Sequence, residues 1–233
     1  MTTFKKIPKK YQPRGFTILY EDRDIIVGNK APGFLTVAAQ WNKEHTVHSA
    51  LNNYVRKGQA RSRQCVYVVH RLDQATSGVL IFAKTQSTQI LLKDDWKNTV
   101  KTYYAVVHGR LAKKSGTVSS YLEEDEEYVI HSSQDSTQGK LSQTEYTVLK
   151  ETERFSLLKI NLLTGRKNQI RVHMADLGHP VAGDSKYGKG FPKFAHLALH
   201  ARSIAFTHPF SKKRFIFEAP VPNYFSKLVD YAY

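Results

Sequence analysis

Cysteine is almost absent from this chain of 233 residues, in which Cys65 stands alone. A single cysteine cannot form an internal disulfide, and it excludes a metal site built from several thiolates. No apolar run approaches the roughly 20 residues that a membrane-spanning helix needs. The first residues also lack the apolar core of a signal peptide, so we expect a cytoplasmic protein without a membrane segment.

Acidic residues are scarce beside basic ones. The chain has 20 Asp and Glu against 35 Lys and Arg, which gives a net charge of +15. Such an excess indicates a polyanionic partner, either nucleic acid or an anionic membrane surface. No long basic amphipathic helix of the membrane-binding kind is evident, and this favours nucleic acid. A basic protein whose charge has no specific role is the alternative.

Basic residues are dense at the N-terminus, where few apolar side chains occur. Residues 1–15 contain Lys5, Lys6, Lys9, Lys10 and Arg14. We predict a flexible basic arm over residues 1–15 that adds contacts to phosphates, with a solvated tail as the alternative. No internal repeat or long linker divides the rest, so residues 16–233 are predicted to form one domain.

Short apolar runs separated by turns outnumber helical patterns. Strands are expected at 18–30 (a hairpin with an acidic turn), 66–69, 79–82, 101–109, 144–149 and 155–163. Helices are expected at 47–56 after a Thr46 cap, after a Ser87 cap, and at 169–177. Because strands predominate without regular βαβ alternation, we predict an α+β fold with a mixed, mainly antiparallel central sheet and flanking helices and loops.

Several common site motifs are missing. The chain has neither a P-loop nor a Rossmann glycine triplet, so no nucleotide cofactor is expected. His196 and His200 have the i, i+4 spacing of metal ligands, but they lie in an apolar stretch. We interpret them as packed or surface histidines and predict no metal site.

Residues 66–82 are the most informative stretch. Two apolar runs flank His70, Arg71 and Asp73, followed by Thr76-Ser77-Gly78. A stretch that only builds a core does not need three ionisable groups in four residues, because burying unpaired charge is costly. Polar groups at a bend between buried strands are held rigidly and can face a cleft. The alternative is a polar turn with a purely structural role.

A lone aspartate restricts the chemistry. Such a carboxylate can act as a nucleophile or as an electrostatic stabiliser at a sugar C1′. A neighbouring arginine would favour its ionised form, and a tyrosine can stack on an extruded base. Together with the basic charge, these parts suit an enzyme that acts on a base removed from its stack.

Five motifs in order carry a resemblance to a known family. They are His70-Arg71-Leu72-Asp73-x-x-Thr76-Ser77-Gly78, Lys101-x-Tyr103-x-Ala105-x-Val107-x-Gly109, Thr164 to His173, Gly183 to Gly188, and Leu199-His200-Ala201. Through them the chain resembles the RluA-type pseudouridine synthases over about residues 17–220. The resemblance implies a pseudouridine synthase-like catalytic domain and an RNA isomerase that needs no cofactor.

The resemblance also implies roles for particular residues. Asp73 would be the catalytic aspartate, and Arg171 would pair with it and hold it ionised. Tyr103 would lie against the target uracil and take part in moving the C5 proton. Ile170 would pack beside the base, and Arg71 would reach into the RNA near the vacated position.

The implied reaction breaks the N1–C1′ bond of uridine, turns the uracil and rejoins it through C5. Attack of Asp73 on C1′ and removal of a C2′ proton to give a glycal both stay open. The expected substrate is a stem-loop of ribosomal or transfer RNA, bound by a monomer. Two alternatives remain: a non-catalytic RNA-binding or ribosome assembly factor on the same fold, and a base-excising glycosylase.

The chain departs from the family pattern at two places. Asn168 stands where the family usually has His, and Lys30-Ala31-Pro32-Gly33 replaces the usual Lys-Pro-x-Gly. Because neither change touches Asp73, Tyr103 or Arg171, activity is expected to survive. We also expect no S4-like RNA-binding domain, because the residues before Tyr20 leave no room for one.

Overall fold

The computed structural model describes residues 7–39, 46–59, 61–137 and 139–231. These residues form two compact units, each of which is described by itself. Unit 1 comprises residues 1–100 and 201–220, and unit 2 comprises residues 101–200 and 221–233. The predicted extent of the N-terminal arm and of one domain over 16–233 stays a prediction. No helix within the described ranges is long and apolar enough to cross a membrane.

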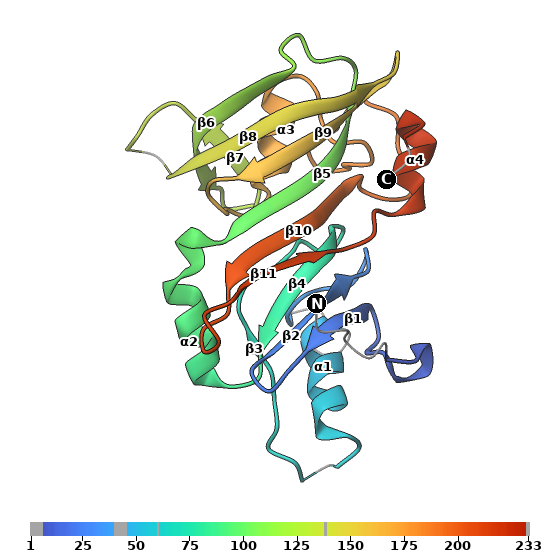
Figure 1. The fold of residues 1–233 in the computed structure, drawn as a ribbon. Coiled ribbons are helices and arrows are strands. Elements are labelled where there is room, and N and C mark those ends of the chain that lie inside the picture. The colour runs from blue at the N-terminus through green and yellow to red at the C-terminus, as the bar shows by residue number, and fades with distance from the viewer. Residues whose placement is uncertain (1–6, 40–45, 60, 138, 232–233) are drawn as a thin grey trace. The chain divides into compact units, whose positions relative to one another are not determined.

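Unit 1 is built on short antiparallel strands. The hairpin β1 (Phe16–Glu21) and β2 (Ile25–Lys30) pairs through β2 with β4 (Ser77–Ala83), and β3 (Tyr67–Val68) pairs with the end of β4 (Figure 1). The strand β11 (Arg214–Glu218) pairs with residues 203–207 of β10 (Leu199–Thr207). The helices are α1 (Val47–Arg56) and α2 (Gln86–Asp94), with short 3₁₀ turns η1 (Lys9–Tyr11) and η2 (Trp96–Asn98).

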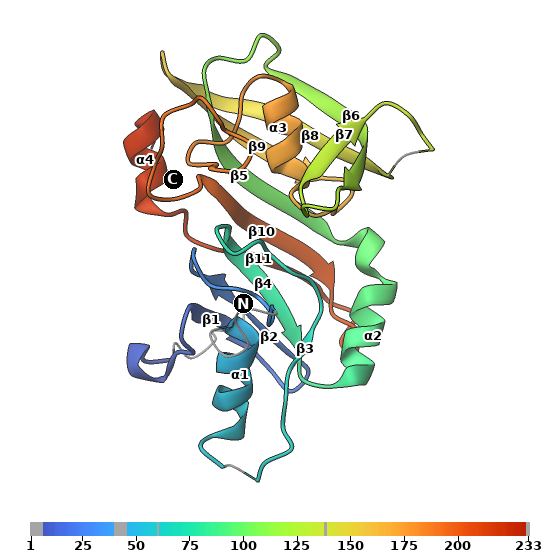
Figure 2. The ribbon, with the colours of Figure 1, turned by 180° about the vertical axis from the view of Figure 1, so that it is seen from behind.

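Unit 2 is a second set of antiparallel strands. Its pairs run from β5 (Val100–His108) to β9 (Phe155–Leu162), then β8 (Lys140–Glu151), β6 (Ser115–Glu124) and β7 (Ile130–Ser133). Figure 2 shows α3 (Gln169–Asp176) beside these strands, and α4 (Asn223–Val229) ends the unit. All these strand pairs are antiparallel, so the predicted α+β, mainly antiparallel fold is confirmed.

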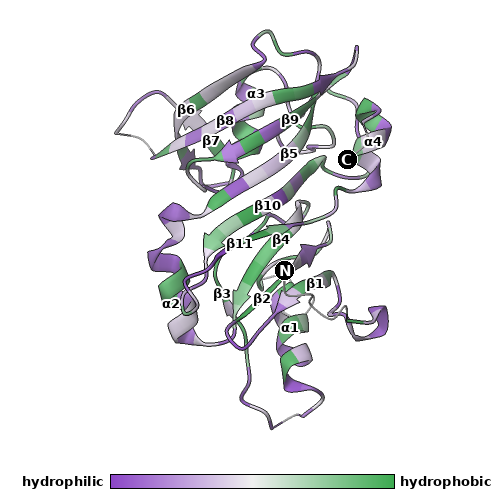
Figure 3. Cartoon of the chain, viewed as in Figure 1, coloured by the Kyte–Doolittle hydropathy of each residue, from purple (hydrophilic) through white to green (hydrophobic). Residues whose placement is uncertain are grey.

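The strand β4 forms the centre of unit 1, since all seven of its residues are buried. Its apolar part is green in Figure 3. Val79, Ile81 and Ala83 alternate along it and pack in a cluster with Ile25 and Val27 from β2. This alternation places one face of the strand in the core. The residues just before β4 are therefore attached to a fully buried strand.

Two local predictions had different outcomes. The side chain of Thr46 accepts a hydrogen bond from the backbone N–H of Ser49 at 3.0 Å, as expected of the cap of α1. The predicted Ser87 cap of α2 was wrong. The cap is Thr85, whose hydroxyl accepts from the N–H of Thr88 at 3.1 Å. Thr and Ser both suit this position, so the spacing alone could not separate them.

Gly78 gives the first testable prediction. Its φ is +119°, and a Cβ at this position would lie 2.3 Å from the carbonyl oxygen of Ala201. We expect Gly78→Ala to lower the free energy of unfolding by about 3 kcal/mol, because backbone strain adds to a clash with main chain. Gly58→Ala is the matched control. Gly58 also has a positive φ, but its Cβ would meet nothing within 4 Å. If urea unfolding showed the same loss of free energy for Gly78→Ala and Gly58→Ala, the predicted clash with Ala201 would be contradicted.

Candidate active site

The candidate catalytic residue, Asp73, lies in the turn that leads into β4. Asp73 is half-buried, and the next residue, Gln74, is exposed. The N–H of Thr76 donates to the backbone carbonyl of Asp73 at 3.1 Å and closes the turn. Asp73 is therefore presented by a short, hydrogen-bonded loop that is anchored to a fully buried strand.

Thr36 fixes the residue before Asp73. Its buried hydroxyl accepts from the N–H of Leu72 at 3.1 Å and donates to the carbonyl of the same residue at 2.9 Å. One side chain therefore satisfies both backbone groups of Leu72, as a neighbouring strand would do. Hydrogen bonds of this kind hold an irregular segment in one conformation.

Lys30 fixes the residue after Asp73. It is fully buried, and its ammonium donates to the carbonyls of Gln74 at 3.1 Å, Ala31 at 3.1 Å and Phe34 at 2.8 Å. Burial lowers the pKa of Lys30 to about 7, and the nearby Asp73 carboxylate offsets part of that shift. The N–H of Gly33 also donates to the Gln74 carbonyl at 2.8 Å. The Lys30-Ala31-Pro32-Gly33 departure thus forms part of the support of the Asp73 turn.

The two residues on the other side of Leu72 differ in environment. The ring Nε2 of His70 accepts from the N–H of Ile81 in β4 at 3.2 Å, and the ring lies 4.9 Å from that of Trp96. His70 therefore holds the turn in place. Arg71 is exposed. Its predicted contact with RNA is compatible with that exposure and stays a prediction.

Unit 2 holds the predicted tyrosine on β5. Tyr103 is 9 % exposed and lies opposite Ile160 of β9. Lys101, two residues earlier, projects from the same face of the strand. Burial lowers the pKa of Lys101, and its Nζ lies within 4.0 Å of the position that a Cβ of Gly165 would occupy. The motif Lys-x-Tyr thus places a buried tyrosine and a half-buried lysine on the same face of β5.

Gln169 anchors the start of α3. Its side-chain oxygen accepts from the hydroxyl of Thr164 at 2.8 Å and the N–H of Arg166 at 3.0 Å. Its amide nitrogen donates to the carbonyl of Gln143 at 3.0 Å and the hydroxyl of Thr144 at 2.9 Å. All the hydrogen-bonding capacity of this buried amide is therefore used, and the helix is tied to β8.

The next two helix residues are the predicted site residues of unit 2. Ile170 is 4 % exposed, as expected of a residue packed beside other groups. The guanidinium of Arg171 makes a bidentate ion pair with Asp184. Its Nε donates to Oδ2 at 2.7 Å, and its Nη2 donates to Oδ1 at 2.8 Å. The sequence did not predict this partner. Gly183-Asp184 was noticed only as part of a motif, without a role.

The predicted site residues are divided between the two units. Asp73 and Arg71 belong to unit 1, whereas Tyr103, Ile170 and Arg171 belong to unit 2. The pairing of Arg171 with Asp73 stays a prediction. Four residues that support them were missed from the sequence, namely Lys30, Thr36, Gln169 and Asp184.

One group of side chains in unit 1 has the composition of a metal site. Ligand atoms of Asp22, Asp24 and His208 lie within 4.8 Å of one another. However, the backbone N–H groups of Phe210 and Ser211 donate to Nδ1 of His208 at 3.3 and 3.1 Å. A neutral ring then carries its proton on Nε2, which lies 3.2 Å from Asp22 and has no lone pair for a metal. This geometry favours a structural role.

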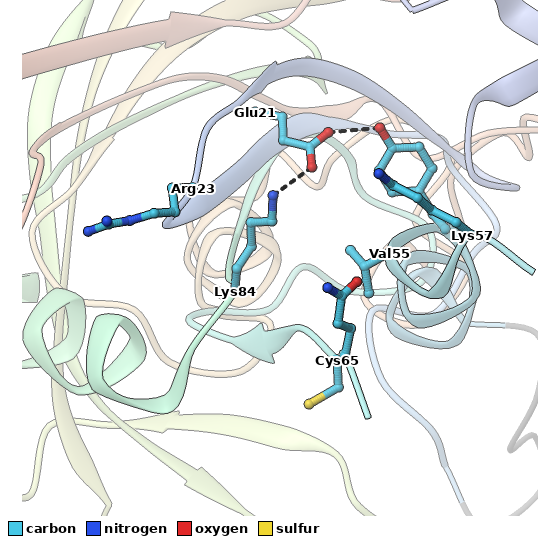
Figure 4. Close-up of a pocket in the computed structure, with 8 residues that line it drawn as sticks. Glu21, Arg23, Val55, Lys57, Cys65 and Lys84 are labelled. Carbon is cyan, nitrogen blue, oxygen red and sulfur yellow. Dashed lines mark hydrogen bonds and ion pairs between the residues drawn. The ribbon is translucent and has the colours of Figure 1, made fainter. Parts of the chain in front are cut away.

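A polar hollow of about 480 Å³ lies at the other end of β4 from the Asp73 turn. Glu21 lines the hollow and is linked to Lys84 at 2.8 Å and to the hydroxyl of Tyr54 at 2.7 Å; dashed lines mark both interactions in Figure 4. Cys65 and Lys57 also line it. Because Lys84 follows β4 and Asp73 precedes it, this hollow is separate from the candidate active site.

Comparison with known proteins assigns the family. Residues 24–176, more than half of the chain, match the family described as RNA pseudouridylate synthase. A Mycoplasma pneumoniae protein, named as an uncharacterized RNA pseudouridine synthase and MG209 homolog, is 37% identical over 97% of this chain and 74% of its own length. Ribosomal large subunit pseudouridine synthase C of Rickettsia bellii is 34% identical over 98% of this chain and 74% of its own length.

The fold agrees with this assignment. The structure of human RNA pseudouridylate synthase domain containing 4 matches with a TM-score of 0.75, 22% identity and 89% coverage of both chains. That likeness concerns the fold, while the sequence matches concern the family. Together with the motif at Asp73, they show that this chain belongs to the RNA pseudouridylate synthase family.

Proposed function

We propose that this chain converts uridine to pseudouridine in structured RNA, with Asp73 as the catalytic carboxylate. The observation that carries the proposal is the construction of the Asp73 turn. Thr36 and Lys30 fix the residues on either side of Asp73, and Asp73 as a whole residue is only half-buried. A purely structural aspartate would not need such support while remaining accessible. Family membership supplies the reaction.

In the proposed reaction the uridine N1–C1′ bond breaks, the uracil turns, and a C5–C1′ bond forms. The C5 proton is lost and the released N1 takes up a proton, so the product has the mass of the substrate. Both routes, attack on C1′ and abstraction at C2′, require an ionised Asp73. We propose that Arg171 supplies the charge that favours this form and that Tyr103 and Ile170 contact the base, while Arg71 reaches into the RNA. These roles follow the motifs in which the residues occur.

A tritium assay combined with product analysis tests the proposed function. The purified chain is incubated with RNA labelled at uridine C5. The nucleosides are then separated, and their masses are measured by mass spectrometry. We expect released tritium and a mass-neutral isomer. Free uracil would instead identify a glycosylase, and binding without turnover would identify an RNA-binding or assembly factor. The isomer is the only product that supports the proposal.

We further propose ribosomal RNA of the large subunit as the substrate, acted on by a cytoplasmic monomer. The support for the substrate is the Rickettsia bellii relative, which is named as a ribosomal large subunit pseudouridine synthase and aligns with nearly all of this chain. Mapping pseudouridine in a deletion strain tests the substrate. We expect a site to disappear from large-subunit ribosomal RNA, whereas a loss confined to transfer RNA would contradict the proposal.

The basic arm gives a prediction about RNA affinity. Lys9 and Lys10 lie in η1, while Lys5 and Lys6 fall outside the described residues. Replacing these four lysines by Ser should reduce the slope of log affinity against log salt by up to about 3.6, since each lost phosphate contact removes about 0.7–0.9. Substitution is preferable to deleting residues 1–12, because the Gln12 side chain accepts from the N–H of Ile18 at 2.7 Å. An unchanged slope would identify a tail without a role.

A further inference from the structure

Arg171 is held by a carboxylate that no water reaches. The Asp184 side chain is 0 % exposed, and that of Arg171 is 12 % exposed. Two parallel N–H···O bonds of 2.7 and 2.8 Å fix the plane of the guanidinium as well as its distance. A bidentate ion pair of this kind allows a narrower range of distances and orientations than a single hydrogen bond does. The direction of the Arg171 side chain is therefore determined by Asp184.

Asp184 is itself fixed and ionised. The N–H groups of Lys186 and Tyr187 donate to its Oδ1 at 2.9 and 3.0 Å. Burial alone would raise the pKa of Asp184. The hydrogen bonds and charge of Arg171, with those two N–H groups, outweigh burial and hold the pKa below its ordinary value. Asp184 thus provides a negative charge whose position is fixed by two backbone N–H groups.

Asn168 holds the third nitrogen of Arg171. Its side-chain oxygen accepts from Nη1 at 3.1 Å, and its amide nitrogen donates to the hydroxyl of Tyr187 at 3.0 Å. The N–H of Ile130 donates to the same hydroxyl at 3.1 Å, and the Tyr187 ring lies 5.1 Å from the guanidinium carbon. The amide therefore links the arginine to the ring that lies against it.

The backbone of Asn168 explains why this residue suits its position. Its φ is +54°, a left-handed conformation that Asn adopts more readily than most residues. A histidine in the same place could also accept from Arg171 with one ring nitrogen and donate to Tyr187 with the other. The departure from the usual His therefore preserves one acceptor and one donor.

We propose that Asp184 and Asn168 are positioning residues that orient Arg171 for the isomerisation. This inference rests on the proposed function, in which Arg171 provides charge for the catalytic step. The cluster uses three of the five N–H groups of the guanidinium, which leaves two for partners outside it. Neither Asp184 nor Asn168 needs to touch the RNA. Their loss should change the rate of the chemical step rather than the affinity for RNA.

Two sets of variants test this proposal by single-turnover tritium release. Asp184→Asn should lower the rate about 100-fold, because one N–H group of Arg171 then faces an amide NH₂ in place of a carboxylate oxygen. The affinity for RNA should change less than threefold. Asp125→Asn is the control, since it removes a carboxylate of unit 2 at an exposed site paired with His131. Its rate should equal that of the wild type.

The Asn168 pair keeps the test decisive if Asp184→Asn fails to fold. Asn168→Ala should slow the reaction about tenfold, and Asn168→His should stay within threefold of the wild type. A role limited to stability would lower the melting temperature of Asn168→Ala without changing the rate at low temperature. That result, or wild-type rates in folded Asp184→Asn, would overturn the inference. An inactive wild type would instead overturn the proposed function.

The pH dependence of the rate distinguishes a role of Asn168 in orienting Arg171 from a nonspecific loss of activity. If Arg171 is misdirected in Asn168→Ala, the acidic limb of the rate profile should move to higher pH. Asn168→His should restore the wild-type profile. A uniform loss of rate at every pH, with the limb unmoved, would contradict a positioning role through Arg171.

Discussion

Replacement of Asp73 by Asn should reduce tritium release from C5-labelled RNA by at least about 10³-fold, the scale on which essential catalytic groups act. An amide can neither attack C1′ nor take a C2′ proton, so both routes lose their reactive group. The shape of the side chain is kept, and the backbone bond from Thr76 to the carbonyl of Asp73 does not involve the carboxylate. The turn should therefore stay folded.

RNA binding provides the second readout of the Asp73→Asn variant. Removal of one negative charge from a basic protein should leave RNA affinity equal to that of the wild type or slightly higher. Asp94→Asn, at an exposed position of α2, is the control for the change in charge. Turnover retained in Asp73→Asn would remove Asp73 from the mechanism. Loss of both turnover and binding would indicate a damaged fold, and melting temperature would verify it.

Local signals predicted part of the secondary structure, although the strands β6 and β7 were not expected from the sequence. The acidic turn at Asp22 is one example, since its Oδ1 accepts from the N–H groups of Asp24 and Ile25 at 2.8 Å and closes the β1–β2 hairpin. The helix expected at 169–177 is observed as α3 over 169–176. These features depend on contacts between residues that are close in sequence. Such contacts leave a pattern of spacing that can be read directly.

The support of the site could not be predicted in this way. Lys30 bonds to Gln74, 44 residues away, and Thr36 bonds to Leu72, 36 residues away. Lysine is almost never fully buried, so nothing in the spacing suggested that this one would be. Asp184 lies in a loop with turn signals, and its partner Arg171 is on a helix. The motifs named the candidate residues, whereas the groups that hold them depend on tertiary contacts.

Lys30 gives the second large effect. In Lys30→Met, the carbonyls of Ala31, Phe34 and Gln74 lose the ammonium that bonds them. We expect the free energy of unfolding at pH 7 to fall by about 3 kcal/mol, because buried acceptors lose their donor. Tritium release should fall at least tenfold in protein that is still folded, since the residue after Asp73 is no longer fixed. Lys93→Met, at an exposed site on α2, should change neither quantity.

The lowered pKa of Lys30 predicts how the free energy of unfolding changes with pH. Burial lowers the pKa of Lys30 from 10.5 to about 7 in the folded chain. Between these values the unfolded chain binds more protons at this position than the folded chain does, so stability from Lys30 rises with pH. This contribution is complete above pH 10.5 and is lost as the pH falls through 7. Urea unfolding of wild type and Lys30→Met should therefore diverge from pH 7 to 10, by at most about 1.4 kcal/mol per pH unit. Parallel stability curves would show that the lysine keeps its proton in the folded chain across this range.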